Sequence, residues 1–242
     1  MTTVVVAPAP FEGALAAAAA ARAIGAGVRL ALPDGEIRSA PVADGGEGTM
    51  DALTAALGGR RRPVGARDPL GRPVEAAIGE LPGAAAVVEL AQASGYERLR
   101  ADERDPEAAG TWGTGGLIRA ARDLGARRIV VGLGGSATTD GGLGLARVLG
   151  ARALDERGEV LDGRGADMAR VVRLDLSRRD PRLADTVIQV ACDVDNPFHG
   201  PRGAAHVFGP QKGAGPAAVA RLDAGLSRLA DVVRAQTGVD LQ

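Results

Sequence analysis

Short apolar runs alternate with Ala-rich or amphipathic stretches along most of the chain. Residues 3–7 (TVVVA) and 128–133 (RIVVGL) are runs of the kind that forms buried strands. The Ala-rich stretch 13–26 follows the first run and predicts a helix. Strands and helices that alternate in this way favour an α/β fold with parallel strands.

The remaining elements continue the alternation. We expect further strands at residues 36–43, 74–79, 85–90 and 187–191, further helices at 50–57, 111–124, 143–149 and 217–235, and a short hairpin at 154–162. Residues 58–72 differ, because Gly, Arg and Pro dominate there, and we place a lobe boundary near Arg67.

The pattern therefore predicts a two-lobed α/β protein. Residues 1–66 are expected to form a Rossmann-like lobe with a parallel sheet, and residues 67–215 a second α/β lobe. Residues 216–242 are expected to form a helix that returns toward the first lobe.

Composition excludes several classes of partner. The 242 residues are 45% apolar and 24% charged, with a formal net charge of −1. No basic excess exists to neutralise a nucleic acid backbone, and no stretch approaches the length of a membrane span. A single cysteine cannot form an internal disulfide, which favours a reducing compartment. We therefore expect a cytoplasmic protein with neither nucleic acid nor membrane as partner.

The chemically rare residues gather in one window, residues 192–213. This window holds the only Cys, the only Asn, the only Lys and both His residues, and every other basic residue is Arg. Lysine is a compact charge on a flexible stem, whereas arginine is a planar fork. The solitary Lys212 therefore indicates a site that needs a point charge.

Gly-rich polar loops follow three of the predicted strands, and in open α/β sheets ligands bind at the carboxyl ends of strands. The first loop carries Asp44, Gly45, Gly46 and Glu47. Its two carboxylates and its glycines make it a candidate part of a ligand site.

The second loop is residues 134–142. Gly134 and Gly135 let backbone N–H groups converge, and Ser136 and Thr138 add hydroxyls before the start of a helix. This arrangement suits an oxyanion or a phosphate. An ordinary strand-to-helix turn explains the same composition, with Asp140 acting only as an N-cap.

The third loop carries Asp193 and Asp195, followed by Asn196. Carboxylates at this spacing can hold Mg²⁺ together with waters, or one of them can take a proton from a substrate hydroxyl. A turn stabilised by Asp and Asn side chains before Pro197 is the structural alternative. Lys212 could neutralise a transferring phosphoryl group or a substrate carboxylate.

Three motifs together resemble the bacterial glycerate kinase family. They are PVADGGEGT at 41–49, GLGGSATTDGG at 132–142 and ACDVDNPFHGPRGAAHVFGPQKGA at 191–214, with further similarity in ELAQASG at 89–95 and TWGTGGLI at 111–118. The resemblance spans essentially the whole chain. It implies a two-lobed α/β enzyme with its site between the lobes, which uses ATP and Mg²⁺ to phosphorylate a hydroxyl of glycerate.

The resemblance also implies roles for individual residues. By position, Asp193 matches the family's candidate base, and Asp195 lies beside it. We predict catalytic roles for Asp193 and Lys212 and a metal role for Asp195. Substrate or phosphate binding is predicted for Asp44, Gly45, Gly46, Glu47, Gly134, Gly135, Ser136, Thr138, Asp140 and Asn196.

The chain departs from the family pattern at several places. A segment like APDSFKGS reads APAPFEGA here, with Ala9 and Glu12 at an Asp and a Lys position, and Thr139 replaces an Asn. Family members also continue well beyond Gln242, with a Gly-rich segment that completes the first lobe. Without it a sheet edge is expected to be exposed unless a homo-oligomer or a partner covers it. The alternative function is a catalytically impaired homologue that acts as a ligand-binding or interaction protein.

Overall fold

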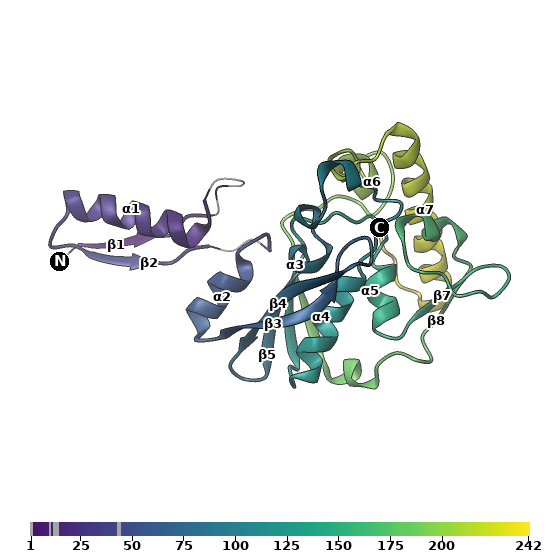
Figure 1. Ribbon diagram of the computed structural model, residues 1–242, viewed down its shortest axis with the longest axis horizontal. Helices are drawn as coiled ribbons and strands as arrows, with labels where there is room; N and C mark the ends of the chain where they lie inside the picture. The colour runs from purple at the N-terminus through teal and green to yellow at the C-terminus, as the bar shows by residue number, and fades with distance from the viewer. Residues whose placement is uncertain (1, 10, 12–14, 43–44) are drawn as a thin grey trace.

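The computed structural model describes residues 2–9, 11, 15–42 and 45–242 and has a mixed α/β fold with parallel strands. A small unit at one side of the molecule contains β1 (Thr3–Val6), α1 (Ala17–Ala31) and β2 (Glu36–Ser39), and its two strands are parallel (Figure 1). The rest of the described chain forms a larger body around a second sheet. Among the described residues no helix is long and apolar enough to cross a bilayer.

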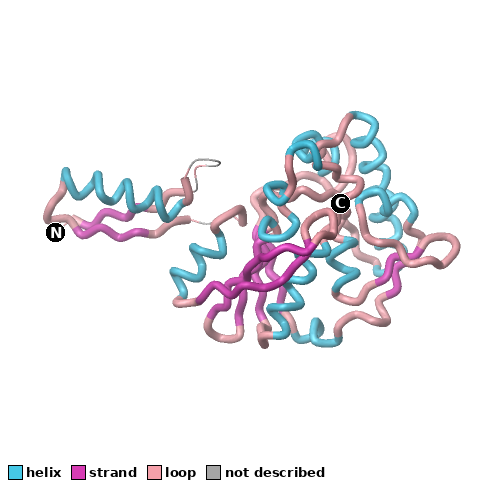
Figure 2. The backbone as a smooth tube through the Cα atoms, viewed as in Figure 1, coloured by secondary structure: helices cyan, strands magenta, loops and turns pink. Residues whose placement is uncertain are grey.

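The larger sheet has five strands, which Figure 2 shows side by side. Their spatial order is β3 (Arg60–Arg67), β4 (Pro73–Leu81), β5 (Ala85–Glu89), β6 (Arg128–Gly132) and β9 (Val187–Ala191). The first three strands are antiparallel, and β5, β6 and β9 are parallel. The carboxyl ends of the parallel strands therefore lie along one edge, where the polar loops follow.

Helices cover both faces of this sheet. In β5 the adjacent residues Val87 and Val88 are both fully buried and face opposite sides, because side chains alternate along a strand. Val87 packs in a cluster with Met50 of α2 (Thr49–Leu57), and Val88 packs in a cluster with Leu117 of α4 (Trp112–Asp123). Burial of apolar surface on two faces explains why this strand lacks alternation of polar residues.

A second apolar cluster holds the carboxyl-terminal helix. Leu222, Leu226 and Leu229 of α7 (Pro216–Thr237) share one face at helical spacing and pack with Met168. The helix thus lies against η3 (Gly165–Arg170) and α6 (Ala204–Phe208) in the larger body, whereas the sequence led us to expect it near the first lobe.

Shorter elements complete the larger body. They are α3 (Ala91–Ser94), α5 (Leu143–Val148), β7 (Arg152–Leu154), β8 (Arg173–Asp175) and the short 3-10 turns η1 (Tyr96–Arg98), η2 (Ala101–Glu103), η4 (Pro181–Asp185) and η5 (Pro210–Lys212). The hairpin expected at 154–162 forms a single bridge between Leu154 and Val160, and β7 also pairs with β8.

Strand β3 was not expected from the sequence, which indicated a boundary segment there. Every residue of β3 pairs with β4, so the larger sheet begins at Arg60 and the expected boundary near Arg67 falls at the end of a sheet strand. Pro63 is accommodated because β3 is an edge strand. Arg60 and Arg62 both form salt bridges with Glu80 on β4.

Two glycines of α4 provide a matched test of its packing. A Cβ at Gly113 would overlap the carbonyl oxygen of Arg67, whereas one at Gly116 would have no heavy atom within 4 Å. We expect Gly113→Ala to lower the free energy of unfolding by about 2 kcal/mol or more. Gly116→Ala should raise it by up to ~1 kcal/mol through helix propensity. Urea denaturation of both variants checks this, and effects of the same sign would contradict it.

Candidate functional site

The first loop lies directly against the carboxyl ends of the parallel strands. Gly45 has a φ of +93°, and a Cβ there would overlap the carbonyl oxygen of Ala191 at the end of β9. The Gly134 N–H donates to the Gly45 carbonyl at 3.1 Å, and the Gly45 N–H donates to Thr49 Oγ1 at 3.1 Å. Glycine at this position therefore brings the first loop into contact with the other two.

Of the other residues predicted in the first loop, Gly46 contacts the second loop and Glu47 faces solvent. A Cβ at Gly134 would lie 2.5 Å from the Cα of Gly46, so these two backbones are in close contact. Glu47 is exposed. Asp44 and Glu12 lie outside the described residues.

The second loop is organised by its own hydroxyls and by a buried carboxylate. The Thr138 N–H donates to Ser136 Oγ at 3.1 Å, and Ser136 Oγ lies 3.1 Å from Thr138 Oγ1. The carbonyl of Gly135 accepts from the N–H of Tyr96 at 3.0 Å. The backbone of this loop is thereby held at the end of β6.

Asp140 is 2% exposed and its carboxylate accepts four hydrogen bonds. Two come from the N–H and Oγ1 of Thr111, at 2.8 and 2.7 Å. The others come from the N–H groups of Gly142 and Gly144, both at 3.1 Å. Asp140 thus serves the start of α5, as an N-cap would, and also joins it to the start of α4.

Burial raises the pKa of Asp140, and the hydrogen bonds from Thr111, Gly144 and Gly142 oppose that rise. Thr111 was not singled out in the sequence. Its only local signal is its place as the first residue of the TWGTGGLI motif, directly before α4, because its partner lies 29 positions away.

A second buried carboxylate, Glu89, ends β5 at the same edge of the sheet. Its Oε1 accepts from the Met50 N–H at 2.7 Å, and its Oε2 accepts from Gln92 Nε2 at 3.3 Å. Burial raises the pKa of Glu89, and these hydrogen bonds oppose the rise. Glu89 therefore fixes the start of α2 beside the first loop. In the sequence it stood only as the first residue of the ELAQASG motif and was not predicted as a site residue.

Lys212, at the end of η5, connects that turn to the second loop. Its Nζ donates to the Thr138 carbonyl at 2.6 Å. Burial of the ammonium lowers the pKa of Lys212 to about 8, and the negative charge of Asp140 opposes this shift. The solitary lysine is therefore a partly desolvated charge held beside the Gly-rich loop.

Asp193 and Asp195 follow the carboxyl end of β9 and are exposed. Within the described ranges neither carboxylate has a hydrogen-bond or ion-pair partner. Asn196 instead shapes the loop, because its Nδ2 donates to the Arg202 carbonyl at 3.0 Å. The third loop thus presents two unpaired carboxylates next to the strand end that contacts Gly45.

The donor set at this loop consists of two carboxylates, Asp193 and Asp195. The described part of the chain brings no group of three or more His, Cys, Asp or Glu side chains together. Mg²⁺ is commonly bound by one or two carboxylates with phosphate and water oxygens, rather than by a cage of protein ligands. Asp193 and Asp195 fit that mode of binding.

Fold and site together define an α/β protein whose parallel strands end in three interlocked Gly-rich loops with carboxylates and one lysine. The family model described as "Glycerate kinase family" matches residues 4–242. The chain belongs to the glycerate kinase family.

Individual relatives agree with this assignment. Glycerate kinase of Halalkalibacterium halodurans is 44% identical over 243 residues, covering 100% of this chain and 64% of the relative. Glycerate 2-kinase of Escherichia coli K12 is 44% identical over 240 residues, covering 99% and 63%. The crystal structure of a protein from Salmonella typhimurium LT2 assigned as glycerate kinase 2 matches with a TM-score of 0.90 and 42% identity, covering 99% of this chain and 64% of that one. The chain thus spans less than two thirds of the length of these relatives.

Proposed function

We propose that this chain acts as a glycerate kinase, transferring the γ-phosphoryl group of ATP to a hydroxyl of glycerate to give phosphoglycerate. The supporting observation is the hydrogen bond from Lys212 Nζ to the Thr138 carbonyl, which holds the only lysine against the Gly-rich loop. The named activities of the relatives give the substrate class.

The proposed chemistry divides among the three loops. Asp193 accepts the proton of the glycerate hydroxyl as its oxygen bonds to the γ-phosphorus, and the bond from that phosphorus to ADP breaks. The backbone N–H of Gly135 and the hydroxyl of Ser136 bind phosphate oxygens, whereas Gly134, whose N–H donates to the Gly45 carbonyl, lets the first loop approach this site. The ammonium of Lys212 neutralises charge on the transferring group.

Asp195 would hold Mg²⁺, and the bound ion would neutralise phosphate charge. Asp44, Gly45, Gly46, Glu47, Thr138, Asp140 and Asn196 remain proposed as residues that line or shape the substrate and phosphate site. We also propose a cytoplasmic location, because the only cysteine is a free thiol.

A coupled assay of ADP release tests the proposal directly. With ATP, Mg²⁺ and glycerate we expect glycerate-dependent turnover at about 1–100 s⁻¹, the usual range for kinases. Calorimetric titration with ATP and with glycerate should show binding of both. Absence of glycerate-dependent turnover would remove the activity.

One observation favours the second candidate function, a catalytically impaired protein that binds a ligand or a partner. In the described part of the chain the β1–α1–β2 unit has a two-stranded sheet and exposes large apolar side chains, with Leu30 87% and Val5 60% exposed. On this alternative the chain binds ATP or glycerate without turnover, or acts through a homo-oligomer or partner on this unit. Turnover at ordinary enzymic rates would rule it out.

The lowered pKa of Lys212 predicts an alkaline limit to activity. Because the ammonium loses its proton as pH rises through about 8, we expect kcat/KM to fall about tenfold per pH unit above that value. Lys212→Arg should be less active at pH 7, since a planar fork replaces a point charge, and should lose the alkaline limb. Rate profiles from pH 6 to 10 measure both effects, and wild-type activity in Lys212→Arg would contradict the role.

The free energy of unfolding should rise with pH over the range in which activity falls. The folded pKa of Lys212 lies below its usual value of 10.5, so the cost of burying its charge is present in full below pH 8. That cost is relieved as pH rises from about 8 to 10.5. Relative to Lys212→Met, the wild-type chain should therefore gain free energy of unfolding over this range, as measured by urea denaturation at pH 7.5 and 10.

A further inference from the structure

Arg104 carries a guanidinium group with a shielded, unpaired nitrogen. Among the described residues the Nε atoms of Arg104, Arg122 and Arg152 are buried without a hydrogen bond. Arg122 bonds elsewhere through Nη1 to the Ala126 carbonyl, and Arg152 through Nη2 to Asp175. The Arg104 side chain has neither a hydrogen bond nor an ion pair within the described ranges. Buried donors are normally paired, so an orphaned one calls for an explanation.

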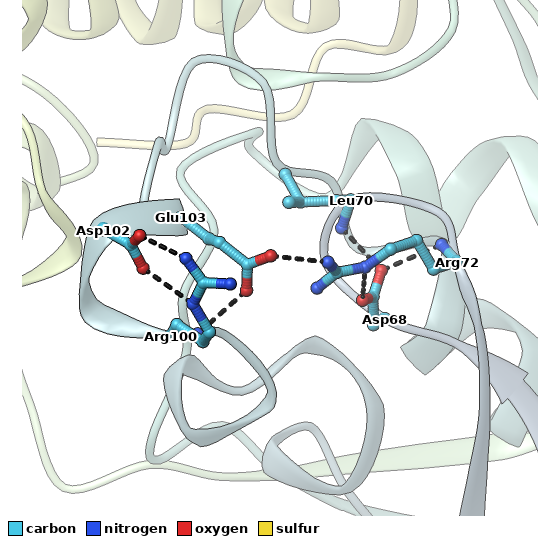
Figure 3. Close-up of polar contacts among 6 residues, drawn as sticks. All are labelled: Asp68, Leu70, Arg72, Arg100, Asp102 and Glu103. Atoms are coloured by element: carbon cyan, nitrogen blue, oxygen red, sulfur yellow. Dashed lines mark hydrogen bonds and ion pairs between the residues drawn. The ribbon is translucent and has the colours of Figure 1, made fainter.

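The acidic residues next to Arg104 in sequence are engaged elsewhere. Figure 3 shows Glu103 directed at Arg72, and Glu103 Oε1 accepts from Arg72 Nη1 at 2.7 Å. Asp102 pairs with Arg100. Asp105 Oδ1 accepts from the N–H groups two and three residues further along the chain. The local charge pattern therefore leaves Arg104 as an uncompensated cation.

Arg104 lies between Tyr96, whose backbone is bonded to the Gly-rich loop, and Gly213. Its guanidinium carbon is 5.2 Å from the centroid of the Tyr96 ring, and the N–H of Tyr96 donates to the Gly135 carbonyl. On the other side its backbone is in close contact with Gly213, where an added Cβ would overlap the Arg104 carbonyl oxygen. Gly213 directly follows Lys212. The guanidinium therefore lies over Tyr96 beside the Gly-rich loop, and the backbone of Arg104 adjoins the segment that carries Lys212.

A second buried polar atom without a partner lies on the Gly-rich loop, residues 134–142. The hydroxyl Oγ1 of Thr139 is buried and has no hydrogen-bond partner, and the residue follows Thr138, the acceptor of the Lys212 hydrogen bond. Two of the four buried polar atoms without partners among the described residues therefore belong to this region. Each such group calls for an explanation, and a polar ligand bound beside it is one.

We propose that Arg104 binds the carboxylate of the small hydroxy acid substrate, an inference that rests on the proposed function. A guanidinium presents parallel N–H donors that match the two oxygens of a carboxylate. The Tyr96 ring orients the guanidinium through a cation–π contact. The compact ammonium of Lys212 then serves the phosphoryl group, so the two cations have separate tasks.

Calorimetric titration with glycerate and with its uncharged methyl ester tests this assignment. We expect Arg104→Gln to weaken glycerate binding by ~10–100-fold, the usual effect of losing hydrogen bonds to a charged group. Binding of the methyl ester and of ATP should change by less than about twofold, because neither uses the carboxylate contact. Arg104→Lys should lie between wild type and Arg104→Gln.

Two further variants make the test specific. Arg100→Gln removes a neighbouring exposed arginine that pairs with Asp102, and it should bind glycerate like wild type. Tyr96→Leu removes the ring below the guanidinium and should weaken glycerate binding by ~2–5-fold. Thermal unfolding of each variant identifies any loss of fold. If Arg104→Gln is unfolded, the affinities of Arg104→Lys and Tyr96→Leu for glycerate decide whether Arg104 binds the carboxylate.

The outcomes distinguish failure of the Arg104 assignment from failure of the proposed function. If Arg104→Gln binds glycerate as wild type does, or loses glycerate and its methyl ester equally, the carboxylate assignment is overturned and the proposed function stands. If the wild-type chain binds neither glycerate nor ATP, the proposed function fails, and the assignment of Arg104 fails with it.

Discussion

Asp193→Asn is expected to lower turnover with glycerate by ~10²–10⁴-fold, the range for loss of a general base. The side chain is exposed and without a partner among the described residues, so the free energy of unfolding should change by less than about 0.5 kcal/mol. Asparagine has nearly the same shape but cannot take a proton from the substrate hydroxyl. Steady-state kinetics with urea denaturation measures both quantities.

The control for this variant is Asp185→Asn. Asp185 is an exposed carboxylate that precedes β9, whereas Asp193 follows it, so the two lie toward opposite ends of the same strand. Asp185→Asn should keep wild-type turnover. Unchanged turnover in Asp193→Asn would exclude Asp193 as the base, and loss of Mg–ATP binding would identify it as an ion ligand instead.

Asp140→Ala is expected to lower the free energy of unfolding by about 3–5 kcal/mol, because several buried donors lose their acceptor together. The N–H and Oγ1 of Thr111 and the N–H groups of Gly142 and Gly144 all donate to this carboxylate. Their loss would also loosen the Gly-rich loop, so the affinity for phosphate ligands should fall. Urea denaturation and calorimetry with ATP test the two effects.

Graded variants distinguish the network from a single hydrogen bond. Asp140→Asn keeps one acceptor oxygen and should cost about 1–3 kcal/mol. Thr111→Val removes one hydroxyl, which donates to Asp140 and accepts from Leu145 N–H at 2.8 Å, and should have a similar cost. Wild-type stability in Asp140→Ala would show that the carboxylate does not hold these helices together.

Local patterns were sufficient for much of the fold. The run at 128–133 became β6, the run at 187–191 became β9, and the stretch 111–124 became α4, with ends shifted by at most a residue or two. These segments could be predicted because a strand or helix buried by its own periodic apolar residues carries its signal within a few positions. The motifs were equally local, and they led to the family that the comparisons show.

Strand β3 and helix α7 show where local patterns were insufficient. The Gly, Arg and Pro residues of β3 do not signal a strand in the sequence. The strand forms because it pairs with β4 and because its arginines bind the carboxylate of Glu80. Helix α7 was expected from its apolar spacing, but the surface it packs against depends on Met168 and its neighbours. A helix sequence specifies an apolar face and not the partner of that face.

The sequence by itself determined most of the strands and helices, though not β3, and it determined the family and which three loops carry the polar side chains. Only the tertiary structure decided how the Gly-rich loop is held by distant segments, through Lys212 with Thr138 across 74 positions and Asp140 with Thr111 across 29. It alone also showed that Arg104 is left without a partner while its acidic neighbours are engaged. The physical reason is that hydrogen bonding and burial depend on distances in space, which residue spacing does not encode once the chain has turned back on itself.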